Sequence, residues 1–399
     1  MSKHFKISRM EFAGSLGDLG TLLPLSVGMI LINNLSPSGI FMGVGLFYIL
    51  SGIYFKVTTP VEPMKVISAY AIATGISASQ IQASCLWVFI VLIIIGSTGL
   101  INVIRQYVAK SVIRGVQLST GLLLLAQGVR LMLGTSSFQI IQNAAEPSLM
   151  IQHFGFLPVG LVLGPILGLL ALFLLDNNRL PAAIVIIGFG ILVGLVLGNH
   201  EGWNHLEIGF NPPLLLPYGL PTVNDFSFAL LILILPQIPM TIGNAVVANV
   251  DLASQYFPKE CNRVTGKALC ISMAIANLGS FLIGGMPMCH GAGGLASRYR
   301  FGARTAGSNL IIGGFFLMIA LLFGDQLLPI INILPFSVLG VLLIFAGIQL
   351  ALTIIDIQTR KELFVVVLIV GIALASNLAA GFLTGIAAAW ILSWERLSV

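Results

Sequence analysis

Long apolar stretches, interrupted by only a few charged residues, recur from one end of the chain to the other. One helical crossing of a bilayer needs about 17–25 mostly apolar residues. Only 8% of the residues are charged, whereas a soluble domain carries about 25%, so the charges are too few to cover a water-facing surface. We therefore expect an all-α polytopic membrane protein.

Glycine, proline and charged residues divide the apolar stretches into two expected sets of segments. The first set comprises residues 11–33, 38–56, 62–76, 80–103, 110–130, 155–176 and 180–198. The second set comprises residues 226–250, 264–285, 288–299, 303–324, 327–351, 361–378 and 380–397. We accordingly expect a first seven-segment repeat over 1–199, an extracytoplasmic connecting loop over 200–224, and a second seven-segment repeat over 225–399.

The positions of the basic residues predict how the chain is oriented. With the N-terminus inside, Arg130 falls outside, Lys65 lies at membrane depth, and the rest of the 19 Lys and Arg residues fall on the cytoplasmic side. This bias favours fourteen segments, with both termini in the cytoplasm and the chain in the cytoplasmic (inner) membrane. It also accounts for the net charge of +5 without a nucleic-acid partner.

The third segment of each set is interrupted. The first reads TTPVEPMKVISAY and the second GGMPMCHGAGGLASRY, and each has a Pro-Met pair before a short helix-like run that closes on Tyr. Because each set has an odd number of segments, the second set is inverted relative to the first. Broken helices at matching positions of an inverted repeat indicate the binding site of a secondary transporter, so we expect half-helices at segments 3 and 10.

The starts of the two short helices are the expected binding elements. Unpaired amides and the positive end of the helix dipole attract anions. We therefore place Met64 and the run Gly291, Ala292 and Gly293 beside the ligand, since glycine lets the backbone come close. The chemistry suits an oxyanion.

Three ionisable residues lie at expected membrane depth, where charges are costly and usually functional. Lys65 either contacts the anion or forms a structural pair with Glu62, three residues earlier. Glu62 is also a candidate proton carrier. Asp18 is a candidate for a cation or proton path, or alternatively a helix cap or a hydrogen-bond partner of a neighbouring helix.

Uncharged polar residues in segments 1 and 8 are further binding candidates. Gln237, Thr241 and Asn244 follow one another at spacings that place them on one helical face. They either line the site or hydrogen-bond between helices. Ser15 and Thr21 in the first segment carry the same two interpretations.

His290 is the last binding candidate, and three arginines near it are expected to have a different role. His290 is a ligand donor, a proton carrier or a buried imidazole with protein partners. Arg298, Arg300 and Arg304 are expected to anchor segments 10 and 11 on the cytoplasmic side. Four scattered cysteines lack metal-ligand spacing, so we expect no metal and no cofactor.

Four motifs carry a family resemblance: GSLGDLGTLLP (14–24), PVEPMK (60–65), PQIPMTIGNAVVA (236–248) and MPMCHGAGGLASRYRFGARTAG (286–307). Together they resemble the molybdate transporter family of the sulfate permease superfamily. The resemblance implies a seven-plus-seven inverted repeat with core and gate domains, and an anion site between the third and tenth helices. It also implies alternating-access transport of molybdate or another tetrahedral oxyanion such as sulfate, and superfamily members commonly form homodimers.

The chain departs from the expected pattern at two places. Sulfate permeases carry a cytoplasmic regulatory domain after the last helix, and we expect none here. Most molybdate-type members are expected to have glutamine where this chain has Glu62. An ionised carboxylate there would repel a dianion, so Glu62 is expected to pair with Lys65, to be protonated, or to face away.

Other classes of function fit the sequence less well. A nucleobase permease on this architecture would need acids in segments 8 and 10, but PQIPMTIGN and MPMCHGAGG have none. No hydrolase or cofactor motif suggests an enzyme. An anion channel on the same fold stays open, as does the choice between proton and sodium as coupling ion.

Overall fold

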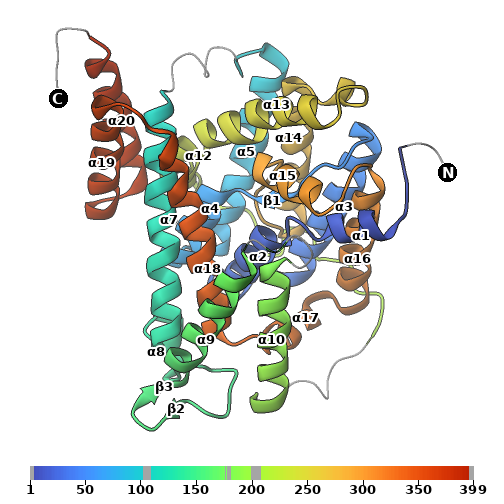
Figure 1. The fold of residues 1–399 in the computed structure, drawn as a ribbon, viewed down its shortest axis with the longest axis vertical. Helices are drawn as coiled ribbons and strands as arrows, with labels where there is room; N and C mark the ends of the chain where they lie inside the picture. Colours follow the sequence, from blue (N-terminus) through green and yellow to red (C-terminus); the bar gives the residue numbers. More distant parts are fainter. Residues whose placement is uncertain (1–3, 102–108, 176, 178–180, 199–207, 395–399) are drawn as a thin grey trace.

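The structure is a computed structural model that describes residues 4–101, 109–175, 177, 181–198 and 208–394. It is almost entirely helical (Figure 1). Its first part contains α1 (Arg9–Ser15), α2 (Leu19–Asn33), α3 (Pro37–Phe55), β1 (Glu62–Pro63), α4 (Lys65–Thr74), α5 (Ala78–Thr98), α7 (Lys110–Leu133), α8 (Ser137–Gln142), β2 (His153–Phe154), β3 (Leu157–Pro158), α9 (Val159–Leu174) and α10 (Ala182–Leu197).

The second part begins with one long helix made of α11 (Val223–Phe228), η2 (Ala229–Ile234), α12 (Leu235–Met240), η3 (Thr241–Val247) and α13 (Ala248–Tyr256). It continues with η4 (Cys261–Arg263), α14 (Gly266–Ile283), β4 (Met288–Cys289), α15 (Ala292–Arg300), α16 (Gly307–Phe323), η5 (Gly324–Gln326), α17 (Leu327–Ile331), α18 (Phe336–Ala351), η6 (Leu352–Asp356), α19 (Arg360–Ala375) and α20 (Leu378–Leu392).

Each predicted segment contains at least one helix, and the two interrupted segments, 62–76 and 288–299, also contain the short strands β1 and β4. Among the described residues, seven helices are long and apolar enough to cross a membrane, and an eighth joins them if α1 and α2, bent by 42°, form one span. The chain is thus a helical, multi-pass membrane protein. The number of fourteen crossings and the inverted relation of the halves stay predictions.

The helices pack in two groups. In the core group, α3 contacts α16 and α14, α5 contacts α14, and α2 contacts α4. In the peripheral group, α7 packs along α18, α19 contacts α7 and α20, and α9 contacts α18 and α10. Figure 1 shows α7, α19 and α20 on one side of the molecule and α3, α14 and α16 on the other. The groups meet where α4 contacts α7 and where α2 contacts α18 and α10.

Prolines shape the long helix over 223–256. Pro236 and Pro239 lie in α12, and wider π-type turns precede and follow this element. A proline has no N–H to donate and its ring crowds the preceding turn, and π-type turns are often found where a helix serves a binding site. The widened turns leave this helix continuous while α12 passes close to α4.

Two short strands cross at the centre of the core group. Strands β1 and β4 pair antiparallel, with Glu62 opposite Cys289 and Pro63 opposite Met288. Each strand leads at once into a short helix, so α4 and α15 begin on either side of the crossing and run away from it. Asn277 of α14 fixes β4 by bonding both the N–H and the carbonyl of Met288 (3.0 and 2.8 Å).

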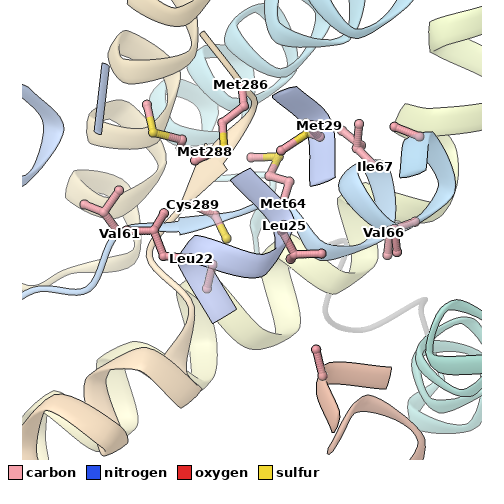
Figure 2. Close-up of a cluster of buried hydrophobic side chains, with 14 of the residues drawn as sticks. Leu22, Leu25, Met29, Val61, Met64, Val66, Ile67, Met286, Met288 and Cys289 are labelled. Atoms are coloured by element: carbon pink, nitrogen blue, oxygen red, sulfur yellow. The ribbon is translucent and has the colours of Figure 1, made fainter. Parts of the chain in front are cut away.

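A layer of sulfur-containing and aliphatic side chains packs around this crossing (Figure 2). Met64, Met286 and Met288 are all buried, and the figure shows them beside residues of α2 and α4. Methionine fills irregular gaps well, and two crossing strands leave such gaps. The packing thereby holds the starts of α4 and α15 at fixed positions.

Candidate functional site

Helix α4 begins at Lys65, and a side chain of α12 holds its first amides. Gln237 Oε1 accepts hydrogen bonds from the N–H groups of Val66 (3.0 Å) and Ile67 (3.2 Å). Gln237 Nε2 in turn donates to Thr241 Oγ1 at 2.9 Å. Both side chains are buried. Gln237 bonds to a neighbouring helix, one of the two alternatives that the sequence left open, and Thr241 bonds to Gln237 within the same long helix. The positive end of the α4 dipole nevertheless points at the site.

Helix α15 begins at Ala292, after the extended residue Gly291. Within the described part of the chain, no hydrogen bond reaches the amides of Ala292 or Gly293. Gly293 is exposed and lines a cavity. The start of α15 therefore offers open N–H groups together with a positive dipole end, and these two features favour an anion.

A cavity of about 500 Å³ lies between the core group and the peripheral group, beside both helix starts. The side chains and backbone of α9, α10 and α18 form its mostly apolar far wall. Its polar lining residues are Asp18, Thr21, Glu62, Lys65, Asn177, Tyr256, Ser297, Arg300 and Gln349. A second cavity of about 200 Å³ also touches Lys65 and Gly293, and it adds Asn244 from η3.

Lys65 and Glu62 form an ion pair at the inner end of the larger cavity. Lys65 Nζ lies 3.3 Å from Glu62 Oε2, and the side chains are 14% and 1% exposed. Glu62 Oε1 accepts a hydrogen bond from Thr21 Oγ1 at 2.7 Å. Glu62 Oε2 is buried, and within the described residues it has no hydrogen bond besides the ion pair with Lys65. The pair is thus structural in this conformation, and the lysine also reaches the cavity.

The same pair lies against the first turn of α15. A Cβ on Gly291 would collide with Glu62 Oε2, and one on Gly294 would lie 3.1 Å from Glu62 Oε1. A Cβ on Gly293 would lie 3.8 Å from Lys65 Nζ. The glycines of HGAGGL therefore provide the space in which the Glu62 carboxylate and the Lys65 ammonium meet the open end of α15.

Electrostatics at this point are balanced rather than strongly positive. Two unit charges about 4 Å apart interact by about 4 kcal/mol at an effective dielectric constant of about 20. An ionised Glu62 would therefore cancel most of the attraction that Lys65 exerts on an anion bound near both.

Asp18 has protein partners on both carboxylate oxygens. Oδ1 lies 3.1 Å from Arg298 Nη1. Oδ2 accepts from the Tyr48 hydroxyl at 2.6 Å and from the Val61 N–H at 3.3 Å. The residue lies at the cavity edge, but its carboxylate serves to tie α2, α3 and α15 together.

Arg298 corrects an expectation from the sequence. We expected a cytoplasmic anchor, but its side chain is fully buried. Besides Asp18, its guanidinium donates to Ser308 Oγ and Asn309 Oδ1 of α16. It also donates to Thr58 Oγ1 in the loop before β1 and to the Ser15 carbonyl of α1. A buried charge needs this degree of pairing. The available signal in the sequence was Asp18, because an acid in an apolar segment requires a cation from another part of the chain.

Besides Gln237 and Thr241, three predicted binding residues lie outside the lining of the two cavities. His290 has a partner on each ring nitrogen, the Pro60 carbonyl at 2.7 Å and Ser272 Oγ at 3.0 Å. The Ser15 hydroxyl donates to the Phe12 carbonyl. Met64 belongs to the packed layer of the strand crossing. The structure therefore gathers Thr21, Glu62, Lys65, Asn244 and the run 291–293 at one place. It leaves these three residues outside it, together with Gln237 and Thr241.

The sequence did not reveal the polar residues that the peripheral group contributes. Gln349 of α18 lines both cavities, and Gln117 of α7 and Thr353 of η6 line the smaller one. Gln117 Oε1 accepts from Thr353 Oγ1 at 3.0 Å, joining α7 to η6. Each glutamine is a polar residue inside an apolar run, which was the available signal.

Comparison with known proteins agrees with this fold. The transmembrane domain of the cyanobacterial bicarbonate transporter BicA superposes with a TM-score of 0.66 at 17% identity, covering 97% of this chain and all of that domain. Murine Slc26a9, an anion transporter solved in the inward-facing state, gives a TM-score of 0.66 at 15% identity, over 98% of this chain and 69% of the other. The chain thus shares the fold of these two proteins.

The family follows from sequence comparison. A family model described as "Molybdate transporter of MFS superfamily" matches residues 10–124 and 229–350. Molybdate transporter 2 of Arabidopsis thaliana is 28% identical over 94% of this chain and 85% of its own length. Molybdate transporter 1 of Chlamydomonas reinhardtii is 29% identical over 94% and 90%. This chain belongs to the molybdate transporter family, which confirms the resemblance carried by the four motifs.

Proposed function

We propose that the chain transports a tetrahedral oxyanion, molybdate, by alternating access. The observation that carries the proposal is the antiparallel pairing of β1 with β4, which brings the starts of α4 and α15 to one cavity with Lys65 between them. The named activity of the family and of its relatives supports the choice of molybdate.

The proposed ligand groups follow from the contacts around Gly293. The amides of the first turn of α15 would donate to oxyanion oxygens, and the Lys65 ammonium would supply a full positive charge. Asn244 also lies beside the start of α15, because its Nδ2 is 3.5 Å from the position that a Cβ on Gly291 would take. Because Gln237 already occupies two amides of α4, α4 would contribute mainly its dipole.

The two helix groups suit a mechanism in which one moves against the other. The cavity lies at their boundary and extends from Lys65 to Arg300, at the last turn of α15. The charge bias of the loops places Arg300 on the cytoplasmic side of the inner membrane, with both termini inside. On this reading the cavity faces the cytoplasm, and movement of the peripheral group past α2 and α15 would open the site to the other side.

Uptake of radiolabelled molybdate into proteoliposomes tests the proposal. Lys65→Ala should reduce uptake at low molybdate concentration by about 10-fold or more, since a charge-assisted contact is worth about 1.5–3 kcal/mol. Lys259→Ala is the matched control, because this exposed lysine lies outside both cavities. Sulfate, which has the same shape and charge, should compete.

Two results would contradict the proposal. One is wild-type protein in proteoliposomes that accumulates no molybdate above the level of empty vesicles. The other is a Lys65→Ala variant with the same concentration dependence as the Lys259→Ala control, which would restrict Lys65 to its structural pair with Glu62.

A further inference from the structure

We propose that Glu62 carries one proton into the cell with each oxyanion, so that the transporter is a proton symporter whose proton sits on the anion site itself. The inference rests on the proposed function, because it concerns the same cavity. It goes beyond that function by naming the coupling ion, the carrier atom and the number of protons.

Geometry singles out one atom, Glu62 Oε2. The carboxylate is 1% exposed, and among the described residues the polar partner of this oxygen is the Lys65 ammonium, 3.3 Å away in the ion pair. It lies against the first turn of α15, where a Cβ on Gly291 would collide with it. The other oxygen, Oε1, is occupied by the Thr21 hydroxyl. A proton bound to Glu62 therefore belongs on Oε2, beside the open amides of α15.

The other carboxylate at the cavity is already committed. Asp18 accepts from Arg298, Tyr48 and the Val61 backbone, so neither of its oxygens is left for a transported proton. The further titratable or charged groups around Glu62 are Lys65 on α4, Cys289 on β4 and, within the same cavity, Tyr256 and Arg300. Of the two carboxylates, Glu62 alone combines an oxygen held only by its ion pair with Lys65 and contact with the open end of α15.

The two charge states of Glu62 match the two states of a carrier. When the site is empty, ionised Glu62 pairs with Lys65 and occupies the end of α15, so the pair is neutral. When a dianion arrives, a proton taken from the outer solution neutralises Glu62. Lys65 is then released to the anion, and the Oε2–H group becomes a donor to an anion oxygen. On the inner side the anion leaves, the proton passes to water, and the pair closes again.

This scheme fixes the stoichiometry and the charge. One dianion and one proton enter together, so each cycle moves one net negative charge inward. With the membrane potential clamped at zero, a proton gradient of one pH unit should hold a molybdate gradient of about tenfold, because one pKa or pH unit corresponds to a factor of ten in equilibrium. Glutamine in place of Glu62 would still donate a hydrogen bond to the anion through its amide, but it would carry no transported proton.

The experiment uses purified full-length protein in proteoliposomes with a pH-sensitive dye trapped inside and the potential clamped. Added molybdate should acidify the lumen in wild type, with one proton per labelled molybdate. Glu62→Gln should move molybdate with no acidification and with uptake independent of the proton gradient. Asp251→Asn, which removes an exposed carboxylate of α13 outside both cavities, should acidify like wild type.

Exchange of labelled for unlabelled molybdate separates the two proposals. Wild-type vesicles that exchange molybdate but never acidify would overturn proton coupling and leave oxyanion transport standing, whereas absence of exchange would overturn transport itself. A monodisperse Glu62→Gln variant that cannot exchange, or that acidifies like wild type, would overturn the role of Glu62. Glu62→Asp is the second variant: it should retain proton influx at a lower rate, and molybdate transport by it without protons would also refute the proposal.

Discussion

Arg298 shows how one buried residue can determine the geometry of a site that it does not line. Its guanidinium joins Asp18 before α2 to Thr58 in the loop before β1 and to Asn309 in α16. Tyr48 closes the network by donating to Asp18 and by placing its ring 5.0 Å from the guanidinium carbon. Every member has a partner, so the network can hold α2 and α15 at a constant separation beside the cavity.

Removal of one partner should therefore be costly. Asp18→Asn leaves the Arg298 charge buried without its counter-ion, and loss of one partner of a buried pair costs about 3–5 kcal/mol. Thermal unfolding in detergent should show this loss, whereas Asp251→Asn, an exposed change, should stay within about 0.5 kcal/mol of wild type. A folded, equally stable Asp18→Asn protein that has lost proton coupling would instead restore Asp18 as the coupling residue.

At the scale of elements, the contact between α7 and α18 is made by glycines spaced two turns apart. A Cβ on Gly128 would lie 2.5 Å from the Gly340 carbonyl oxygen, and one on Gly121 would lie 2.5 Å from that of Gly347. Small residues of this kind let membrane helices approach closely, where packing replaces the hydrophobic effect as the driving force. The two helices can thus move together as one part of the peripheral group.

Gly128→Ala tests whether this close approach matters. The added methyl group has no room, so we expect a loss of about 1–3 kcal/mol and a lower thermal midpoint. Gly371→Ala in α19 is the matched control, because a Cβ there meets nothing within 4 Å and alanine favours the helix by about 1 kcal/mol. Equal midpoints for the two variants would show that the α7–α18 contact relaxes without cost.

For the whole molecule, the sequence predicted the helices and the two interruptions, because apolar length and Pro-Met pairs are local signals. It also predicted that Lys65 and the glycines after His290 would lie together. It did not predict that β1 would pair with β4, since a two-residue pairing between distant segments has no periodicity to detect. Arg298 and Gln349 were missed for a related reason, because their roles depend on partners far away in the chain.

The central claim is that the oxyanion binds between Lys65 and the first turn of α15. The most direct measurement is a crystal structure of the full chain with molybdate, in which the anomalous scattering of molybdenum locates the metal atom of the anion without ambiguity. The account predicts one peak within contact distance of Lys65 Nζ and the Gly293 amide, in the cavity that both residues line. A peak elsewhere in the chain, with this cavity free of molybdenum at saturating molybdate, would contradict it.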